Sequence, residues 1–228
     1  MPNTPLNAAA LIVFDLDGTL VDSRAHIARA VRETARIAGL PEPSAAAIPR
    51  VIGLSLHEAL SLLFPGSTPA TLTELHAVYR RIFAAWRAQG EHHEPLFDGS
   101  HDIIAELEGR GFVLGIATGK GRGGVDYILD KHRLTGRFAT IQTPDIAPGK
   151  PDPTMLHQAM ADTGVGPART IMVGDTTFDM AMAGAAKTQA LGVSWGNHGP
   201  NELRESGAHA VIDRWGQFME TVDELLAP

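Results

Sequence analysis

The chain has 228 residues and a formal net charge of −7 at pH 7, with 44% hydrophobic and 20% charged residues. This composition is typical of a folded globular protein, and the acidic balance argues against nucleic-acid or anionic-membrane partners, which select a basic surface. Cysteine is absent, which excludes disulfides, thiolate metal sites and cysteine nucleophiles.

The N-terminal sequence lacks the basic segment and the apolar run of a signal peptide. No stretch approaches the roughly 20 apolar residues that a membrane-spanning helix needs. We therefore expect a cytoplasmic protein with no membrane partner. The sequence does not indicate the oligomeric state.

Strands and helices are predicted to alternate along most of the chain. Short apolar runs predict five strands: Leu11–Phe14, Phe112–Ala117, Thr170–Val173, Ala190–Val193 and Ala210–Ile212. Segments with helical periodicity lie between most of these strands: Ser100–Arg110, Gly124–Lys131, Pro153–Asp162 and Phe178–Ala185. Such alternation predicts an α/β fold with a parallel sheet covered on both faces, and ligands bind such sheets at the carboxyl ends of the strands.

Residues 22–95 interrupt this alternation because they contain no convincing strand. Their periodicity predicts four helices instead: Ala25–Ala38, Ser44–Val51, Leu56–Phe64 and Ala70–Ala88. We expect an inserted all-α cap domain over residues 22–95, placed over the mouth of the sheet. Residues 1–21 and 96–228 would then form the catalytic core.

Two aspartates end the first predicted strand, in the sequence LIVFDLDGTL. An Asp-Gly turn accounts for Asp17 but leaves Asp15 unexplained. A calcium loop of the EF-hand type would need glycine and glutamate where Leu20 and His26 stand. Crowded carboxylates repel unless a cation intervenes, and oxygen ligands suit Mg²⁺. The pattern therefore predicts a magnesium site, with Thr19 able to donate a hydrogen bond to a carboxylate or a phosphate.

Further polar side chains follow other predicted strands or lie in constrained loops. Thr118 follows the second strand, Lys150 lies between glycine and proline in APGKPDP, and Asp175 and Asp179 follow the strand that ends in IMVG. Each feature alone is weak. Together they predict one site that combines acids, a hydroxyl group and a fixed cation.

These residues resemble the four motifs of the haloacid dehalogenase superfamily. The motifs read here as Asp15-Leu16-Asp17-Gly18-Thr19, Thr118, Lys150, and Gly174-Asp175 through Asp179. The resemblance covers nearly the whole chain and includes a helical cap of type I. Within the superfamily, the sequences LVDS, RVIGLSLHEAL and GVSWG are most similar to those of phosphoglycolate phosphatase-like hydrolases. The resemblance implies a Rossmann-like core and a small phosphorylated metabolite as substrate.

The resemblance also implies a role for each motif residue. Asp15 would be the nucleophile that forms an aspartyl-phosphate, and Asp17 the general acid and base. Mg²⁺ would be held by the Asp15 carboxylate, the Asp17 backbone carbonyl and Asp175, with Asp179 supporting the metal or orienting Lys150. Thr118 and Lys150 would bind the phosphoryl group and complete the catalytic set. An acid at position 17 favours phosphate esters over the carbon substrates of dehalogenases.

Substrate binding is expected to involve Thr118, Gly119 and Lys150 in the core, with Arg50 and Gly53 in the cap. In related enzymes this part of the cap closes over the active site and contacts the leaving group. The Trp195–Gly199 loop is expected to abut the cap or line the site.

Three alternatives stay open from the sequence. A β-phosphoglucomutase-like phosphotransferase shares the same core and cap, although such enzymes commonly carry valine where Thr19 stands. The stretch Gly119–Gly124, GKGRGG, has the form of a dinucleotide-binding fingerprint, but this function would leave the four acids without a role. A phosphoaspartate receiver also uses clustered acids, but it has about half this length and no cap.

Overall fold

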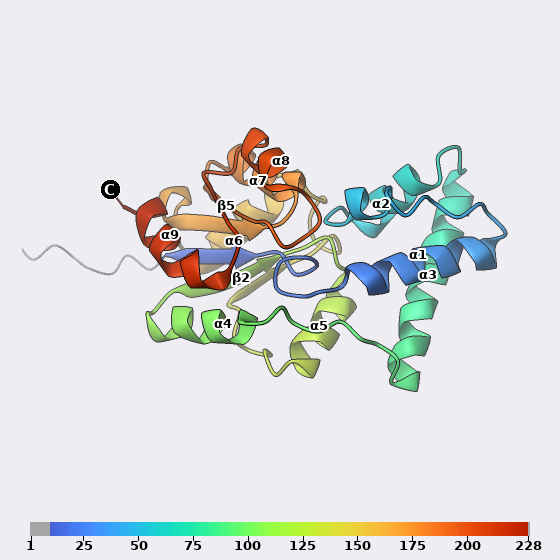
Figure 1. Cartoon of the computed structure of the whole chain (residues 1–228), viewed down its shortest axis with the longest axis horizontal. Helices are drawn as coiled ribbons and strands as arrows, with labels where there is room; N and C mark the ends of the chain where they lie inside the picture. The colour runs from blue at the N-terminus through green and yellow to red at the C-terminus, as the bar shows by residue number, and fades with distance from the viewer. Residues whose placement is uncertain (1–9, 228) are drawn as a thin grey trace, which may run out of the picture.

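The computed structural model describes residues 10–227. Residues 1–9 and 228, which were assigned to the core, lie outside the described residues. The described part contains one parallel sheet of six strands in the order β3-β2-β1-β4-β5-β6 (Figure 1). The strands are β1 (Leu11–Phe14), β2 (Val113–Ala117), β3 (Thr140–Gln142), β4 (Thr170–Gly174), β5 (Gln189–Val193) and β6 (Ala210–Ile212). The prediction of an α/β fold with a parallel sheet is thus confirmed.

Strand β1 lies at the centre of the sheet and is buried on both faces. Its side chains alternate: Ile12 and Phe14 belong to one apolar cluster, whereas Leu11 and Val13 belong to another. All four side chains are fully buried. This double burial explains why β1 is a continuous apolar run rather than an alternating one.

Helices cover both faces of the sheet. The cluster of Ile12 and Phe14 includes residues of α4 (Ser100–Gly109), α5 (Arg122–Lys131) and α9 (Phe218–Leu225). The cluster of Leu11 and Val13 includes residues of α6 (Thr154–Thr163), α7 (Thr177–Ala186) and α8 (Pro200–Glu205). Figure 1 shows α4 and α5 below the sheet and α7 and α8 above it.

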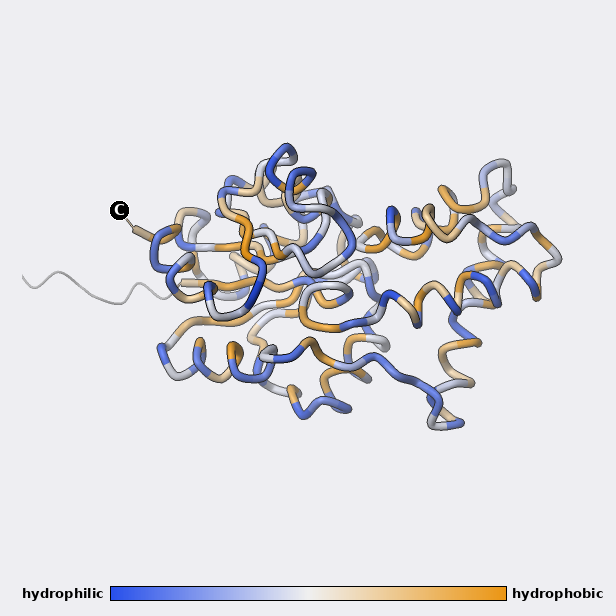
Figure 2. Tube along the Cα trace, in the orientation of Figure 1, coloured by the Kyte–Doolittle hydropathy of each residue, from blue (hydrophilic) through white to orange (hydrophobic). Residues whose placement is uncertain are grey.

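The helices of residues 22–95 lie beyond one end of the sheet, at the right in Figure 1. We call this part the cap segment. It contains α1 (Arg24–Ala38), α2 (Leu56–Leu63) and α3 (Pro69–Gln89), with two apolar clusters of its own. Figure 2 shows hydrophilic and hydrophobic residues alternating along these helices, which is typical of helices that bury one face. The exact limits 22 and 95 stay a prediction.

One predicted helix is wrong, and within the described residues one strand and two α-helices were missed. Residues 45–48 form a turn, and only the short 3-10 helix Pro49–Val51 follows. The reason is Pro49, which has no N–H to donate to the carbonyl four residues earlier in a helix that began at Ser44. The missed elements are short: β3, α8 and α9. Among residues 10–227, no helix is long and apolar enough to cross a membrane.

Candidate active site

Asp15 and Asp175 lie side by side because β1 and β4 are neighbours in the sheet. Phe14 is in register with Val173, and the backbone N–H of Asp15 donates to the carbonyl of Val173 at 2.9 Å. Strand β1 is also the point from which the strand order proceeds in two directions. Parallel sheets open a ligand crevice at the carboxyl ends of strands at such a switch point.

Lys150 joins this pair from the loop before α6. Its Nζ lies 3.0 Å from Asp15 Oδ2 and 2.6 Å from Asp179 Oδ1, and its side chain is fully buried. Burial opposes the charge of the ammonium, but the two carboxylates outweigh burial and raise the pKa of Lys150 above its usual value. Lys150 is therefore a fixed point charge between two acids, as its position between glycine and proline predicted.

Asp179 is held by the start of α7. Thr176 caps this helix, and its N–H and hydroxyl donate to Asp179 Oδ2 at 3.0 and 2.6 Å. This capping box satisfies otherwise unpaired groups of the first turn. It also turns the other oxygen of Asp179 toward Lys150.

Asp175 receives hydrogen bonds from two loops. The Thr19 hydroxyl donates to Oδ1 at 2.9 Å, and the backbone and side-chain N–H groups of Asn197 donate to Oδ2 at 2.7 and 2.8 Å. The predicted hydrogen bond from Thr19 to a carboxylate is thus present. Gly18 and Gly196 pass so close that a Cβ on either would collide with the Asp175 side chain. Asn197 was not predicted, although its loop was expected to abut the cap or line the site.

Three of the four predicted metal-ligating acids form one buried cluster. Oxygen atoms of Asp15, Asp175 and Asp179 lie within 4.8 Å of one another. Burial is the largest cause that raises the pKa of Asp15 to about 7, aided by the neighbouring acids and opposed by Lys150. Burial and Asp179 likewise raise the pKa of Asp175 to about 6.

These residues fit a divalent cation such as Mg²⁺. All the available ligand atoms are oxygens, which Mg²⁺ prefers. Burial, with a smaller contribution from the neighbouring acids, raises the pKa of Asp15 and Asp175 even though Lys150 opposes the rise at Asp15. Asp15 Oδ2 accepts no hydrogen bond of good geometry among residues 10–227, although Lys150 is close to it. A cation would supply the charge that this cluster lacks.

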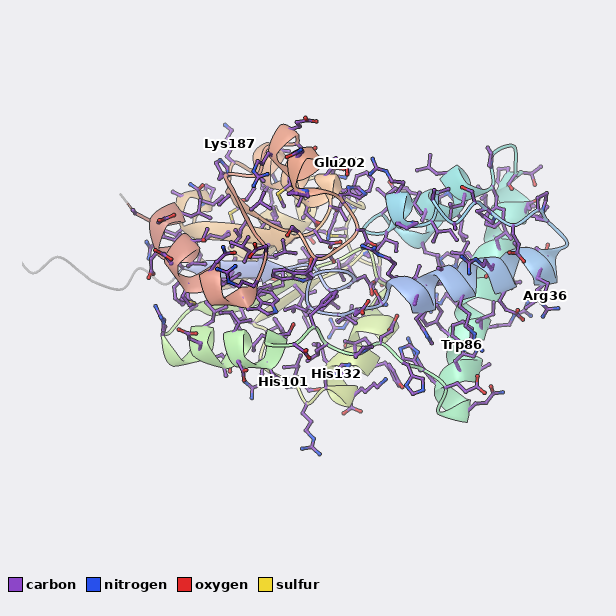
Figure 3. All side chains as sticks on the ribbon, in the orientation of Figure 1. Arg36, Trp86, His101, His132, Lys187 and Glu202 are labelled. Atoms are coloured by element: carbon purple, nitrogen blue, oxygen red, sulfur yellow. The ribbon has the colours of Figure 1, made fainter. Side chains whose placement is uncertain are left out.

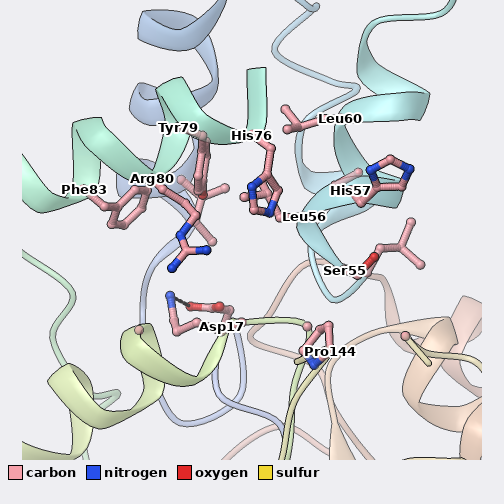
Figure 4. A pocket seen from close by; sticks show the side chains of 18 of the residues that line it. Asp17, Ser55, Leu56, His57, Leu60, His76, Tyr79, Arg80, Phe83 and Pro144 are labelled. Carbon is pink, nitrogen blue, oxygen red and sulfur yellow. Dashed lines mark ion pairs between the residues drawn. The ribbon is translucent and has the colours of Figure 1, made fainter. Parts of the chain in front are cut away.

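Asp17 lies outside the acidic cluster and faces a cleft between the core and the cap segment. Its Oδ1 is 3.1 Å from Nζ of Lys120, the contact marked by the dashed line in Figure 4. Lys120 also lies 3.4 Å from Oε1 of the fully buried Glu94. Sequence reasoning missed Lys120 and Glu94 as site residues. The only hint was that the lysine follows Thr118 and Gly119 directly.

Three of the five predicted substrate-binding residues, Thr118, Gly119 and Gly53, lie where the core meets the cap segment. Thr118 is buried beside the Asp15 strand end, and its N–H donates to Gln142 at 3.1 Å. Gly119 lies directly beneath the cap loop, since a Cβ there would collide with the carbonyl oxygens of Gly53 and Leu54. Gly53 has a φ of 102°, a conformation that favours glycine.

Arg50 does not point into this cleft. Its guanidinium forms an ion pair with Glu202 of α8 at 2.7 Å, and Figure 3 shows Glu202 on the part of the core nearest the cap segment. Arg50 therefore links cap and core in this structure. Its predicted contact with substrate stays a prediction.

The glycines of GKGRGG also have packing roles. Gly119 makes room for the cap loop, and a Cβ on Gly124 would collide with the side-chain stem of Lys120. Gly121 precedes the first residue of α5. The spacing that resembles a dinucleotide fingerprint thus coincides with close approaches within the chain.

Comparisons with known proteins agree with this geometry. A family model described as haloacid dehalogenase-like hydrolase matches residues 12–193. The chain is 33% identical over 219 residues to "Probable phosphatase IndB" of Dickeya dadantii, with 95% of this chain and 94% of that protein covered. It is 29% identical over 223 residues to a phosphoglycolate phosphatase of Vibrio cholerae, with 95% and 98% covered. The crystal structure of a hydrolase from Pseudomonas syringae is similar, with a TM-score of 0.84, 25% identity, and 96% and 100% covered.

Proposed function

We propose that this chain, which belongs to the haloacid dehalogenase-like hydrolase family, is a phosphatase that hydrolyses a small phosphate monoester through an aspartyl-phosphate on Asp15. The observation that carries the proposal is the buried cluster of Asp15, Asp175, Asp179 and Lys150 with Asp17 beside it at the cleft. The similarity to phosphatases supports the same reaction.

In the first step, a carboxylate oxygen of Asp15 attacks phosphorus, and the bond from phosphorus to the leaving oxygen breaks. Asp17 gives its proton to that oxygen, so that a neutral alcohol departs. Asp17 suits this role because it faces the cleft, whereas Asp15 lies in the buried cluster. The product of this step is a mixed anhydride on Asp15.

In the second step, water attacks phosphorus, and the bond to the Asp15 oxygen breaks. Asp17, now a carboxylate, takes the proton from the water. Inorganic phosphate and the free Asp15 carboxylate result, so the enzyme is restored. Lys150 and the Thr118 hydroxyl group would bind phosphoryl oxygens during both steps.

We further propose that Mg²⁺ is the cofactor. The Asp15 and Asp175 carboxylates and the Asp17 backbone carbonyl would hold it, and Asp179 would orient Lys150, which it contacts at 2.6 Å. When bound, the cation supplies positive charge against the repulsion between the phosphate and the acids. The raised pKa values of Asp15 and Asp175 support a need for that charge.

The test is phosphate release from a panel of phosphorylated metabolites with and without Mg²⁺. We expect Asp15→Asn to abolish release and to remain folded by circular dichroism, whereas the exposed Asp130→Asn retains activity. With a phosphate ester that has a good leaving group, Asp17→Asn should accumulate one phosphoryl group on Asp15. Mass spectrometry after acid quenching would detect it. Wild-type turnover by Asp15→Asn would refute the mechanism.

A further inference from the structure

The cleft beside Asp17 is far larger than a two-carbon leaving group requires. Its volume is about 740 Å³. Its walls come from α1, α2, α3 and residues 48 and 51–55 of the cap segment, and from residues 119–124, 144–145 and 147–149 of the core. Pockets of roughly 300–1,000 Å³ enclose ligands the size of drugs or cofactors. The space thus exceeds what a glycolate moiety would fill.

One wall of the cleft is apolar and belongs to the cap segment. Ile27, Val31, Leu56, Tyr79 and Phe83 line it. Figure 4 shows Tyr79 and Phe83 on the same helix above the cleft, with Leu56 across from them. Burying apolar ligand surface against such a wall is favourable, at about 25 cal/mol for each Å². A wall of this kind selects a leaving group with an apolar body.

The cleft is also positively charged, although the chain as a whole is acidic. Five cationic side chains but only two acidic ones line it. The cations are Arg80, Arg81, Arg87, Lys120 and Arg122, and the acids are Asp17 and Asp145. A local excess of positive charge raises the concentration of anionic ligands. In the proposed mechanism Lys150 and the metal held by the acidic cluster would compensate the phosphoryl group, and Lys150 does not line this cleft, so the cations of the cleft would be left for a second anion.

Several of these cations are already engaged with neighbours. Lys120 pairs with Asp17, Arg122 pairs with Asp126, and the guanidinium of Arg87 lies over the ring of Tyr127. Arg80, in contrast, has no ion pair or hydrogen bond within residues 10–227. Figure 4 shows its side chain extending from α3 across the cleft toward the side that carries Asp17.

We propose that the substrate is a phosphate monoester whose leaving group has an apolar body, larger than a two-carbon acid, and a second anionic group that pairs with Arg80. This inference rests on the proposed function, because it assigns the part of the substrate that departs from phosphorus. The apolar wall holds the body, and the planar guanidinium holds a carboxylate or a second phosphate.

The test compares three phosphate monoesters of primary alcohols: that of para-hydroxymethylbenzoate, that of its methyl ester, and phosphoglycolate. The first two differ only in the anionic group, and the third lacks the apolar body. We expect kcat/KM for the benzoate to exceed that for the methyl ester roughly tenfold, as one charge-assisted hydrogen bond allows. We also expect it to exceed the value for phosphoglycolate.

Arg80→Gln should bring the ratio of the two aromatic substrates close to one, mainly by raising KM for the benzoate. Arg32→Gln is the matched control, since Arg32 is exposed on the cap segment and does not line the cleft; it should keep the wild-type ratio. The ratio cancels any general loss of activity in either variant.

The outcomes separate the two proposals. Phosphate release from all three esters with a benzoate to methyl-ester ratio near one in wild type would overturn the second anionic group and leave the hydrolase function intact. A tenfold ratio that is the same in wild type and Arg80→Gln would overturn the pairing of that group with Arg80. A preference for phosphoglycolate would overturn the apolar body. No release from these three esters, together with release from the metabolite panel, would overturn this inference alone. No release from either set in the presence of Mg²⁺ would overturn the hydrolase function as well.

Discussion

Lys120 Nζ lies 3.1 Å from Oδ1 of Asp17, the proposed acid and base. The same ammonium lies 3.4 Å from Glu94, where the chain passes from the cap segment into the core. Although burial alone would raise it, Lys120 and His92 lower the pKa of Glu94 to about 2. One cation thus compensates two carboxylates at the boundary between cap and core.

Replacing this cation should weaken both the fold and catalysis. We expect Lys120→Met to lower the free energy of unfolding by about 3 kcal/mol, because Glu94 keeps a buried charge without its cation. We also expect kcat to fall about tenfold or more, since Asp17 loses the contact that fixes its orientation. Urea unfolding and steady-state kinetics measure the two effects.

The exposed Lys187 offers a matched control for that substitution. Lys187→Met removes the same charge at a surface position of the core, labelled in Figure 3, and should change neither quantity appreciably. If Lys120→Met matched Lys187→Met in both stability and kcat, Lys120 would have no positioning role.

Adding Mg²⁺ should stabilise the protein, because a ligand that binds only the folded state raises the midpoint of unfolding. Asp15, Asp175 and Asp179 are buried within 4.8 Å of one another. We expect saturating Mg²⁺ to raise Tm by several degrees, measured by differential scanning calorimetry. Removal of the metal with a chelator should reverse the shift.

Asp175→Asn provides the variant for this test, since it removes one ligand and one of the crowded charges. It should fold without metal, because burial and Asp179 raise the pKa of Asp175 and so already disfavour its charge. It should also lose the Mg²⁺-dependent shift, whereas Asp130→Asn retains it. An equal shift in Asp175→Asn and wild type would place the metal elsewhere.

The core of the site could be predicted because its signals are local in sequence. Asp15 and Asp175 each follow a buried strand directly, and parallel strands deliver such residues to the same edge of the sheet. The capping relation of Thr176 and Asp179 spans only three residues. Each of these features can be read without knowing how the cap segment packs.

Contacts that depend on tertiary packing could not be predicted in the same way. Asn197 reaches Asp175 across 22 residues, and Lys120 reaches Glu94 across 26. Neither pair has a periodic or motif-like spacing. The orientation of the Arg50 side chain could not be predicted for the same reason. Its partner Glu202 lies on α8, a short helix that the apolar pattern did not reveal.

The close packing of the cap loop on Gly119 should be needed for efficient turnover. In Gly119→Ala the new methyl group would collide with the carbonyl oxygens of Gly53 and Leu54, which are backbone atoms and cannot rotate away. We expect the cap loop to move outward and kcat/KM to fall about tenfold or more, since small displacements of positioning groups are costly. Steady-state kinetics on the best substrate of the panel measures this.

Gly184→Ala is the control for adding a methyl group to a glycine. Gly184 lies within α7, and among the described residues no atom outside its chain neighbours and its own helix backbone lies within 4 Å of its would-be Cβ. This substitution should raise stability by about 0.5–1 kcal/mol through helix propensity and leave kcat/KM unchanged. Wild-type kcat/KM in Gly119→Ala would show that close packing of the loop is not required.

His26 should make the protein less stable as the pH falls. It is buried on α1, with its ring 4.5 Å from that of Trp86 and 5.4 Å from that of Phe83. Burial is the main cause that lowers the pKa of His26 to about 4. The charged groups that face it act in both directions: Glu94 favours the imidazolium, whereas His92, Arg29 and Lys120 oppose it.

The sign follows from the proton count. Between pH 6.5 and about 4 the unfolded chain holds a proton on His26 that the folded chain does not hold, so stability falls as the pH falls through this window. The expected loss between pH 7 and pH 5 is about 2 kcal/mol at most. His26→Phe keeps an aromatic ring and cannot take the proton.

Urea unfolding of wild type and His26→Phe at both pH values therefore isolates the effect of this histidine. The stability of wild type relative to His26→Phe should decrease from pH 7 to pH 5, because only wild type gains a proton on unfolding. His93→Phe is the control. It removes an exposed histidine that does not pack against Phe83 or Trp86, so this variant should keep the wild-type pH dependence of stability. If the difference in the free energy of unfolding between wild type and His26→Phe is the same at both pH values, the cap segment accommodates the imidazolium. The buried surroundings of His26 near Trp86 would then not exclude charge.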